Sequence, residues 1–253
     1  MKKIPFLVIL FICCHLNAFS AEFFHHYETE HGFTLHLPFG WYDAPESKIQ
    51  LLSQAASSSD SEESDELKYH YGYQKGSSDE WFTSPPYILI TVNTTERLNE
   101  DEVKDIDATV EKMQREFDKT INENEQFIRD IYVEDAWYDE EKKIFFSNLA
   151  FDTTDGNDIR SLSAIILTSS GHIDFYLYSS KDKFDENLSL FTDIVSSVSI
   201  EEEIQFTPRF SDNFLFLNRY NIIKSKKSPV FAIGALIICL LLWRVRQNYF
   251  SSK

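Results

Sequence analysis

Two apolar segments, one near each end of the chain, constrain its architecture more than any other feature. The first runs over Ile4–Cys14 after Met1-Lys2-Lys3, and the second covers Val230–Trp243. A basic start, a short apolar stretch and small residues at Ala18 and Ser20 are typical of a secretory signal, whereas a membrane span needs about 20 apolar residues. We therefore predict a signal peptide over residues 1–20 that is cleaved after Ser20.

The second segment is apolar on every side, so it has no amphipathic face with which to dock on a protein core. As a helix it would measure about 21 Å, and adding Pro229, Val245 and the snorkelling side chains of Arg244 and Arg246 extends it to about 25 Å. We predict a single transmembrane helix over residues 229–245. Because the N-terminus is exported, residues 246–253 are expected in the cytoplasm. The expected location is a bacterial inner membrane, with the large domain facing the periplasm.

Charge separates the exported part from the two ends. All 41 acidic residues lie between Ala21 and Ile223, where they meet 16 of the 24 basic residues, so this part carries 16 − 41 = −25. Such a charge disfavours nucleic acid as a partner and favours cationic partners or divalent ions. The alternative is a solvated acidic surface with no ligand. Cys13, Cys14 and Cys239 all lie in the predicted signal or span, so the exported part has no disulfide and no catalytic thiol.

The exported part divides into a folded domain and a stalk. We predict the domain over residues 21–200 and a stalk over residues 201–228 that leads to the membrane. Residues 57–66, SSSDSEESDE, are serine-rich and acidic and contain too little apolar surface to bury. They are therefore predicted to form a solvated loop within the domain.

Hydrophobic periodicity predicts an α+β fold, an antiparallel sheet flanked by helices. Apolar residues spaced by three and four, from Val103 to Ile121, predict one long helix, and alternating or continuous apolar runs predict strands. Turns are expected at Gly32, Asp155-Gly156 and Ser170-Gly171. The other predicted helices are Lys48–Ala56 and Phe184–Val198. The predicted strands are Phe23–Tyr27, Phe33–Leu37, Tyr87–Val92, Ile131–Trp137, Lys143–Phe151, Ser161–Thr168 and His172–Ser179.

One motif resembles a known family. The segment Gly32–Trp41, GFTLHLPFGW, resembles the opening of PsbP-like proteins, a superfamily that includes extrinsic photosystem PsbP, a Ran-binding import factor and DcrB-like proteins. The end of the domain is also similar, with a hairpin at Ser170-Gly171 and a helix that closes at Ser196-Ser197-Val198. The resemblance implies an α/β/α sandwich that acts as a binding or assembly module. It implies no shared catalytic residues and no cofactor.

Histidines gather near the predicted start of the domain. If Phe23–Tyr27 and Phe33–Leu37 form a hairpin about Gly32, His25 and His36 lie opposite each other, within about 5 Å. Together with His31 or Glu28, they would suit zinc or copper. We therefore name His25, His31 and His36 as candidate ligands of a divalent metal.

The sequence contains no recognisable catalytic motif, neither H-E-x-x-H nor G-x-S-x-G. The segment 152–158 is acidic, but its spacing does not fit a calcium loop, and a hairpin is expected there. Trp41, Trp81 and Trp137 are expected in the core or at strand ends rather than along a ligand groove. The function predicted from the sequence is a non-enzymatic, membrane-tethered interaction or assembly module with a protein partner. The alternative is a metal- or small-ligand-binding protein that uses the histidine-rich hairpin.

Overall fold

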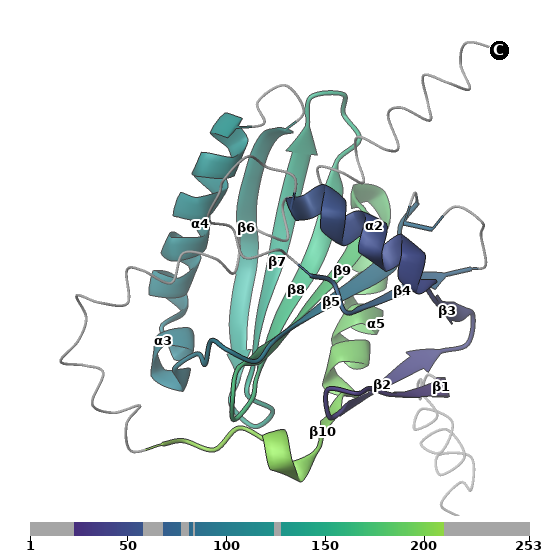
Figure 1. The fold of residues 1–253 in the computed structure, drawn as a ribbon. Coiled ribbons are helices and arrows are strands. Elements are labelled where there is room, and N and C mark those ends of the chain that lie inside the picture. Colours follow the sequence, from purple (N-terminus) through teal and green to yellow (C-terminus); the bar gives the residue numbers. More distant parts are fainter. Residues whose placement is uncertain (1–22, 58–67, 77–80, 83, 124–127, 210–253) are drawn as a thin grey trace, which may run out of the picture.

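The structure is a computed structural model that describes residues 23–57, 68–76, 81–82, 84–123 and 128–209. Its strands form two sheets in which neighbouring strands are antiparallel, one of three strands in the order β1-β2-β10 and one of seven in the order β3-β4-β5-β9-β8-β7-β6 (Figure 1). The strands are β1 (Phe23–Glu28), β2 (Phe33–Pro38), β3 (Trp41–Asp43), β4 (Tyr71–Lys75), β5 (Tyr87–Asn93), β6 (Ile128–Asp139), β7 (Ile144–Thr153), β8 (Ile159–Leu167), β9 (His172–Ser180) and β10 (Ser199–Ile200).

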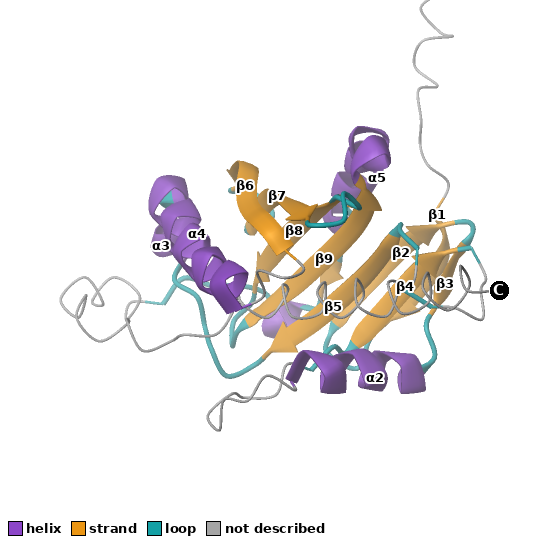
Figure 2. Ribbon diagram, turned by 90° about the horizontal axis from the view of Figure 1, so that it is seen from above, coloured by secondary structure: helices purple, strands orange, loops and turns teal. Residues whose placement is uncertain are grey.

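The helices cover both faces of the larger sheet (Figure 2). One face packs against α2 (Glu46–Ser57), α3 (Glu100–Lys104) and α4 (Ile106–Glu123). The other face packs against α5 (Phe184–Ser196) and the three-stranded sheet. Successive residues of β9 alternate between the two cores, since Tyr176 and Tyr178 join the first and Phe175 and Leu177 the second. The observed fold is therefore α+β, as predicted.

The predicted periodicities correspond to observed elements, with one break. Each predicted strand is present, including the hairpin through Asp155-Gly156. The predicted long helix is divided at Asp105, whose Oδ1 accepts a hydrogen bond from the N–H of Ala108 and so caps α4. Val103 of α3 and Phe117 of α4 nevertheless share one core, so the apolar stripe continues across the break.

The segment after β10 packs on the domain. Residues 201–228 were expected to form a stalk, but Gln205 pairs with Thr168 and Phe206 is buried. The guanidinium of Arg97 lies 4.6 Å from the Phe206 ring and donates to the carbonyl of Thr207 at 2.9 Å. The folded part therefore includes residues beyond Ile200.

The predicted signal peptide, residues 58–66 of the acidic loop, residues 210–228 of the stalk, the predicted span 229–245 and the tail lie outside the described residues. Among the helices that the structure does describe, none combines the length and the apolar character that crossing a membrane requires.

Candidate functional site

Part of the α5 side of the larger sheet has none of the described helices over it. Helix α5 packs mainly on β8, β9 and β2, while α4 packs on β6 from the opposite side. Figure 2 shows β6 and β7 curving away beside α5, with none of the described helices above them. We call the α5-facing side of β6 and β7 the open face. Three cross-strand pairs form its centre: Tyr132–Ala150, Asp135–Asn148 and Trp137–Phe146.

The register shows which way these side chains point. Residues directly opposite each other on antiparallel strands share a face, and Phe146 belongs to the core beneath α5. The Trp137 ring stacks on the Phe146 ring with 4.9 Å between centroids and 14° between planes. Trp137 is half-buried, so it covers the core with one ring face and turns the other outward. The sequence predicts that Trp41 and Trp137 pack in the core or at strand ends. Trp41 is buried in the core, and Trp137 lies within β6 and packs against that core.

Asn148 is the unusual polar residue of the open face. It lies between Phe146 and Ala150 on β7 and is only 8% exposed. Its side-chain Oδ1 is buried and has no hydrogen-bond partner among the described residues. An unsatisfied buried acceptor costs about 1–3 kcal/mol, so such a group calls for an explanation. A donor supplied by a bound partner would provide one.

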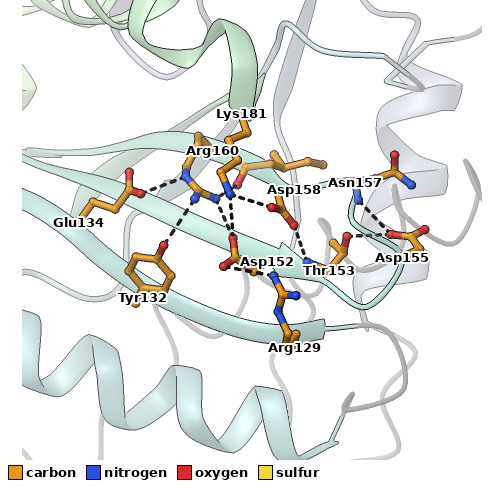
Figure 3. Close-up of polar contacts among 11 residues, drawn as sticks. Arg129, Tyr132, Glu134, Asp152, Thr153, Asp155, Asn157, Asp158, Arg160 and Lys181 are labelled. Atoms are coloured by element: carbon orange, nitrogen blue, oxygen red, sulfur yellow. Dashed lines mark hydrogen bonds and ion pairs between the residues drawn. The ribbon is translucent and has the colours of Figure 1, made fainter.

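A network of ion pairs closes one end of the open face (Figure 3). Arg160 of β8 is its centre, with a side chain only 6% exposed. Its Nε lies 3.0 Å from Glu134 Oε1, and its Nη1 lies 3.1 Å from Asp152 Oδ1. Its Nη2 also donates to Tyr132 Oη at 3.4 Å. This buried cation therefore fixes residues of β6, β7 and β8 together.

Further cations complete the network. Lys181 Nζ lies 2.8 Å from Asp158 Oδ2, and Arg129 Nη2 lies 3.6 Å from Asp152 Oδ2. Burial raises the pKa of Asp158, but hydrogen bonds from Lys181 and from the N–H of Thr153 outweigh it and leave this pKa below its usual value. Three cations thus meet three carboxylates, so the network is balanced and structural in character.

The acidic segment 152–158 forms the expected hairpin turn within this network. Asp155 Oδ1 accepts from Thr153 Oγ1 at 2.7 Å and from the N–H of Asn157 at 3.2 Å. At the opposite end of the open face, Lys142 Nζ donates to the carbonyl of Ser196 at 2.7 Å. Polar contacts therefore bound the open face at both ends.

The histidine hairpin forms, but in a different register from the predicted one. The backbone places His26 opposite His36, and His25 opposite Leu37, because of an irregularity between Phe23 and His25. The predicted pairing of His25 with His36 is therefore wrong by one residue. His31, in the turn, has its Nδ1 2.6 Å from Tyr71 Oη.

The same hairpin carries the three histidines predicted to bind a divalent metal. In the part of the chain whose side chains are described, no three potential ligands gather as a metal site would require, and the side chains of residues 23–26 are not among them. Binding of a divalent metal through His25, His31 and His36 stays a prediction. A zinc titration of the wild-type chain and of His36→Ala would test it, and equal affinities would count against it.

His70 was not singled out from the sequence, yet it joins this cluster. Its ring lies 4.8 Å from the His31 ring, and its Nδ1 accepts a hydrogen bond from the N–H of Val92 at 3.0 Å. Burial, together with the nearby charges of His31 and Lys68, lowers the pKa of His70 to about 4. The folded chain therefore keeps this imidazole neutral, with its proton on Nε2.

Acid should weaken the fold through His70. Since its pKa falls from 6.5 in the unfolded chain to about 4 in the folded chain, the unfolded state binds the extra proton between these values. The stabilisation is complete above pH 6.5 and is lost as the pH falls toward 4. After discounting for partial exposure, we expect a loss of about 1–2 kcal/mol. Urea unfolding at pH 7.5 and 4.5 measures it. His70→Asn, whose Oδ1 can accept from Val92 without titrating, should show a smaller pH dependence, and an unchanged one would contradict the assignment.

A second histidine pairs with a carboxyl group in the interior. His172 Nε2 lies 3.6 Å from Asp174 Oδ2, which also accepts from Thr91 Oγ1 at 3.1 Å. Burial raises the pKa of Asp174. The His172 Nδ1 lies 3.0 Å from the carbonyl of Glu96, which requires the proton on Nδ1. The two side chains are 1% and 7% exposed, so the pair ties β9 to the loop before α3 rather than meeting a substrate.

These elements define an α+β protein built on a seven-stranded antiparallel sheet. Solved structures that are similar to it include the following two. Cyanobacterial PsbP (CyanoP) from Synechocystis is 13% identical, with a TM-score of 0.48 over 70% of this chain and 91% of its own. The protein of unknown function PA94 from Pseudomonas aeruginosa is 8% identical, with a TM-score of 0.30 over 73% of this chain and 96% of its own. No protein-family model and no curated protein matches the chain.

Proposed function

We propose that this chain is a membrane-tethered, extracytoplasmic module that binds a protein partner through its open face and performs no chemistry of its own. The observation that carries the proposal lies on this face, which none of the described helices covers. It combines half-buried Trp137 and Tyr132 with an Asn148 Oδ1 that has no hydrogen-bond partner among the described residues. Aromatic side chains that combine a flat apolar body with a polar group are enriched at protein interfaces. The open face thus has the composition of the centre of an interface.

The side chains of β6, rather than its backbone edge, are suited to contact a partner. β6 is the last strand of the larger sheet, and its pairing with β7 has irregularities near Arg129 and at Glu134. Bulges and carboxylates on an edge strand hinder the pairing of a further strand. We therefore place the binding contacts on the open face itself.

The absence of chemistry is supported by the state of the titratable groups. The carboxylates near the open face that lie in the ion-pair network, Glu134, Asp152 and Asp158, each have a cationic partner. The His172–Asp174 pair is enclosed in the core. A general acid or base needs access to its substrate, and the enclosed His172–Asp174 pair lacks it.

Cross-linking on intact spheroplasts tests the orientation and the surface together. A membrane-impermeant cross-linker should join the wild-type chain to a partner, giving an adduct of one defined mass. Trp137→Ser should reduce this adduct at least five-fold. Phe39→Ser, which alters a 73% exposed aromatic residue in the turn between β2 and β3, should leave it unchanged.

Two outcomes would contradict the proposal. The absence of any adduct with several linker lengths would count against a partner on the outer side of the membrane. An adduct of equal yield in wild type and Trp137→Ser would move the binding surface away from the open face. Circular dichroism of each variant shows whether it folds. If Trp137→Ser does not fold, the cross-linking yield is measured with Asn148→Leu instead. This variant leaves the Trp137–Phe146 stack in place.

A further inference from the structure

Carboxylates and aromatic rings alternate along the open side of β6. The strand IRDIYVEDAWYD has four acidic residues and one basic residue. By register, Asp130, Asp135 and Asp139 lie opposite Asp152, Asn148 and Ile144 of β7, the side on which Tyr132 and Trp137 also lie. Glu134 shares this side, because it contacts Arg160 there. Tyr132 and Trp137 therefore each have a carboxylate on either side of them along the strand.

We propose that the open face binds a lysine- or arginine-rich segment of the protein partner, an inference that rests on the proposed function above. The ammonium or guanidinium group would lie over the outward face of Trp137, whose inner face is covered by Phe146. The flanking carboxylates of Asp135 and Asp139 would neutralise its charge. The apolar stems of such side chains pack well on aromatic rings.

The spacing of the two rings sets the spacing of the cations. Tyr132 and Trp137 are opposite Ala150 and Phe146, which are four residues apart on β7, or about 14 Å. An extended segment with a basic residue at every fourth position would match this separation. The guanidinium of Arg160 lies 5.9 Å from the centre of the Tyr132 ring and helps to fix its position.

Asn148 supplies an independent reason to expect a donor-rich occupant. The Asn148 Oδ1 is a buried acceptor without a partner in the described part of the chain. Asn148 lies opposite Asp135, between the Tyr132–Ala150 and Trp137–Phe146 pairs. Lysine and arginine side chains carry only donors, whereas a carboxylate carries only acceptors. A cationic segment can therefore satisfy this atom, and an acidic one cannot with its side chains.

The charge of the surrounding chain favours the same class of partner. The exported part carries an excess of 25 acidic residues, which repels anionic segments and attracts cationic ones. Arg160, which contacts Tyr132, is held by Glu134 and Asp152 and so offers little to an anion. We therefore choose a cationic polypeptide over an acidic or nucleic-acid ligand.

A designed peptide tests the inference on the full chain in a neutral detergent. The probe is a fluorescein-labelled peptide with lysine at every fourth position and serine between, and its counterpart has glutamate in place of lysine. Fluorescence anisotropy should show binding of the lysine peptide that weakens with salt, and no binding of the glutamate peptide. Trp137→Ala should weaken binding at least ten-fold.

Asn148→Leu separates a binding role from a structural one. Leucine is similar in volume and removes the unsatisfied carbonyl, so the melting temperature should stay the same or rise. Binding of the lysine peptide should nevertheless weaken about five-fold, because a cationic donor loses its acceptor. A lower melting temperature with unchanged binding would show that Asn148 serves the fold alone and would overturn its part in the site.

A charge-matched control distinguishes a specific surface from general acidity. Asp130→Asn with Asp135→Asn removes two carboxylates from β6, and Glu102→Gln with Asp107→Asn removes two exposed ones from α3 and α4, on the opposite side of the sheet. The first pair should weaken binding about ten-fold and the second less than two-fold. Equal losses would overturn the proposal, since any acidic surface would then suffice.

The remaining outcomes separate this inference from the proposed function. If the lysine peptide does not bind while the spheroplast adduct still depends on Trp137, the partner is not cationic but the module stands. If the adduct is also absent, the proposed function fails. If binding occurs only after Lys224, Lys226 and Lys227 are replaced by serine, the chain's own segment occupies the open face, which overturns the assignment to a partner.

Discussion

Alanine in place of Gly171 is expected to destabilise the fold by about 3 kcal/mol or more, as overpacking against rigid backbone does. A Cβ atom at Gly171 would lie 1.8 Å from the carbonyl oxygen of Asn93 and 2.7 Å from its carbonyl carbon. Asn93 cannot easily retreat, because it ends β5 and its side chain accepts hydrogen bonds from the N–H groups of Thr95 and Glu96. Urea unfolding followed by circular dichroism measures the loss in the free energy of unfolding.

Gly156→Ala provides the matched control. Gly156 lies in another of the predicted glycine turns and has φ of +79°, and nothing lies within 4 Å of its added Cβ. It should therefore lose only the cost of a left-handed alanine, about 1–2 kcal/mol. If Gly171→Ala were no more destabilising than Gly156→Ala, the close approach between the β8–β9 turn and the end of β5 would be wrong.

The elements that the sequence predicted well are those in which one period dominates. In β9, Ile173, Phe175 and Leu177 point to one core while Tyr176 and Tyr178 point to the other, and Asp174 is the only polar residue between Ile173 and Tyr178. In α4 the apolar residues recur at helical spacing and face the core from one side. Such patterns arise within a single element, so no knowledge of its neighbours is needed.

The sequence did not predict β4, because its residues are determined by contacts with a neighbouring segment rather than by a strand pattern. Its sequence is Tyr-Gly-Tyr-Gln-Lys, which lacks the β-branched residues typical of strands. Gly72 is required because a Cβ there would lie 2.6 Å from the Phe82 ring, and Gln74 accepts a hydrogen bond from the N–H of Phe82. The composition of β4 is therefore explained by a segment ten residues away that crosses it.

The candidate site was predictable in part. The acidic and aromatic residues of β6 are visible in the sequence, and Trp137 was expected in the core or at a strand end. That α5 leaves their side of the sheet uncovered depends on where the helix packs, which periodicity does not specify. The pairing of His25 with His36 was wrong for a related reason, since one irregularity in a strand shifts the register by one residue.

Arg160→Met should be the most destabilising change in the ion-pair network, by about 2–3 kcal/mol, because it removes a nearly buried cation from its two carboxylates, Glu134 and Asp152. Methionine keeps much of the apolar volume, so the effect reports the charge. Asp152 would retain Arg129 at 3.6 Å and Lys181 at 3.9 Å, which places the expected loss at the lower end for a broken buried pair. Glu134 would lose its contact with β8 altogether. Urea unfolding at neutral pH measures the difference from wild type.

Arg115→Met is the control, because Arg115 forms an exposed pair with Glu111 on α4, at 2.6 Å and one helical turn apart. Exposed pairs of this kind contribute about 0.5 kcal/mol or less. A loss of similar size in both variants would mean that burial adds nothing to the Arg160 network. A large loss confined to Arg160→Met would show that this cation fixes β6 against β8, and hence that the open face owes its shape to a balanced network rather than to a covering helix.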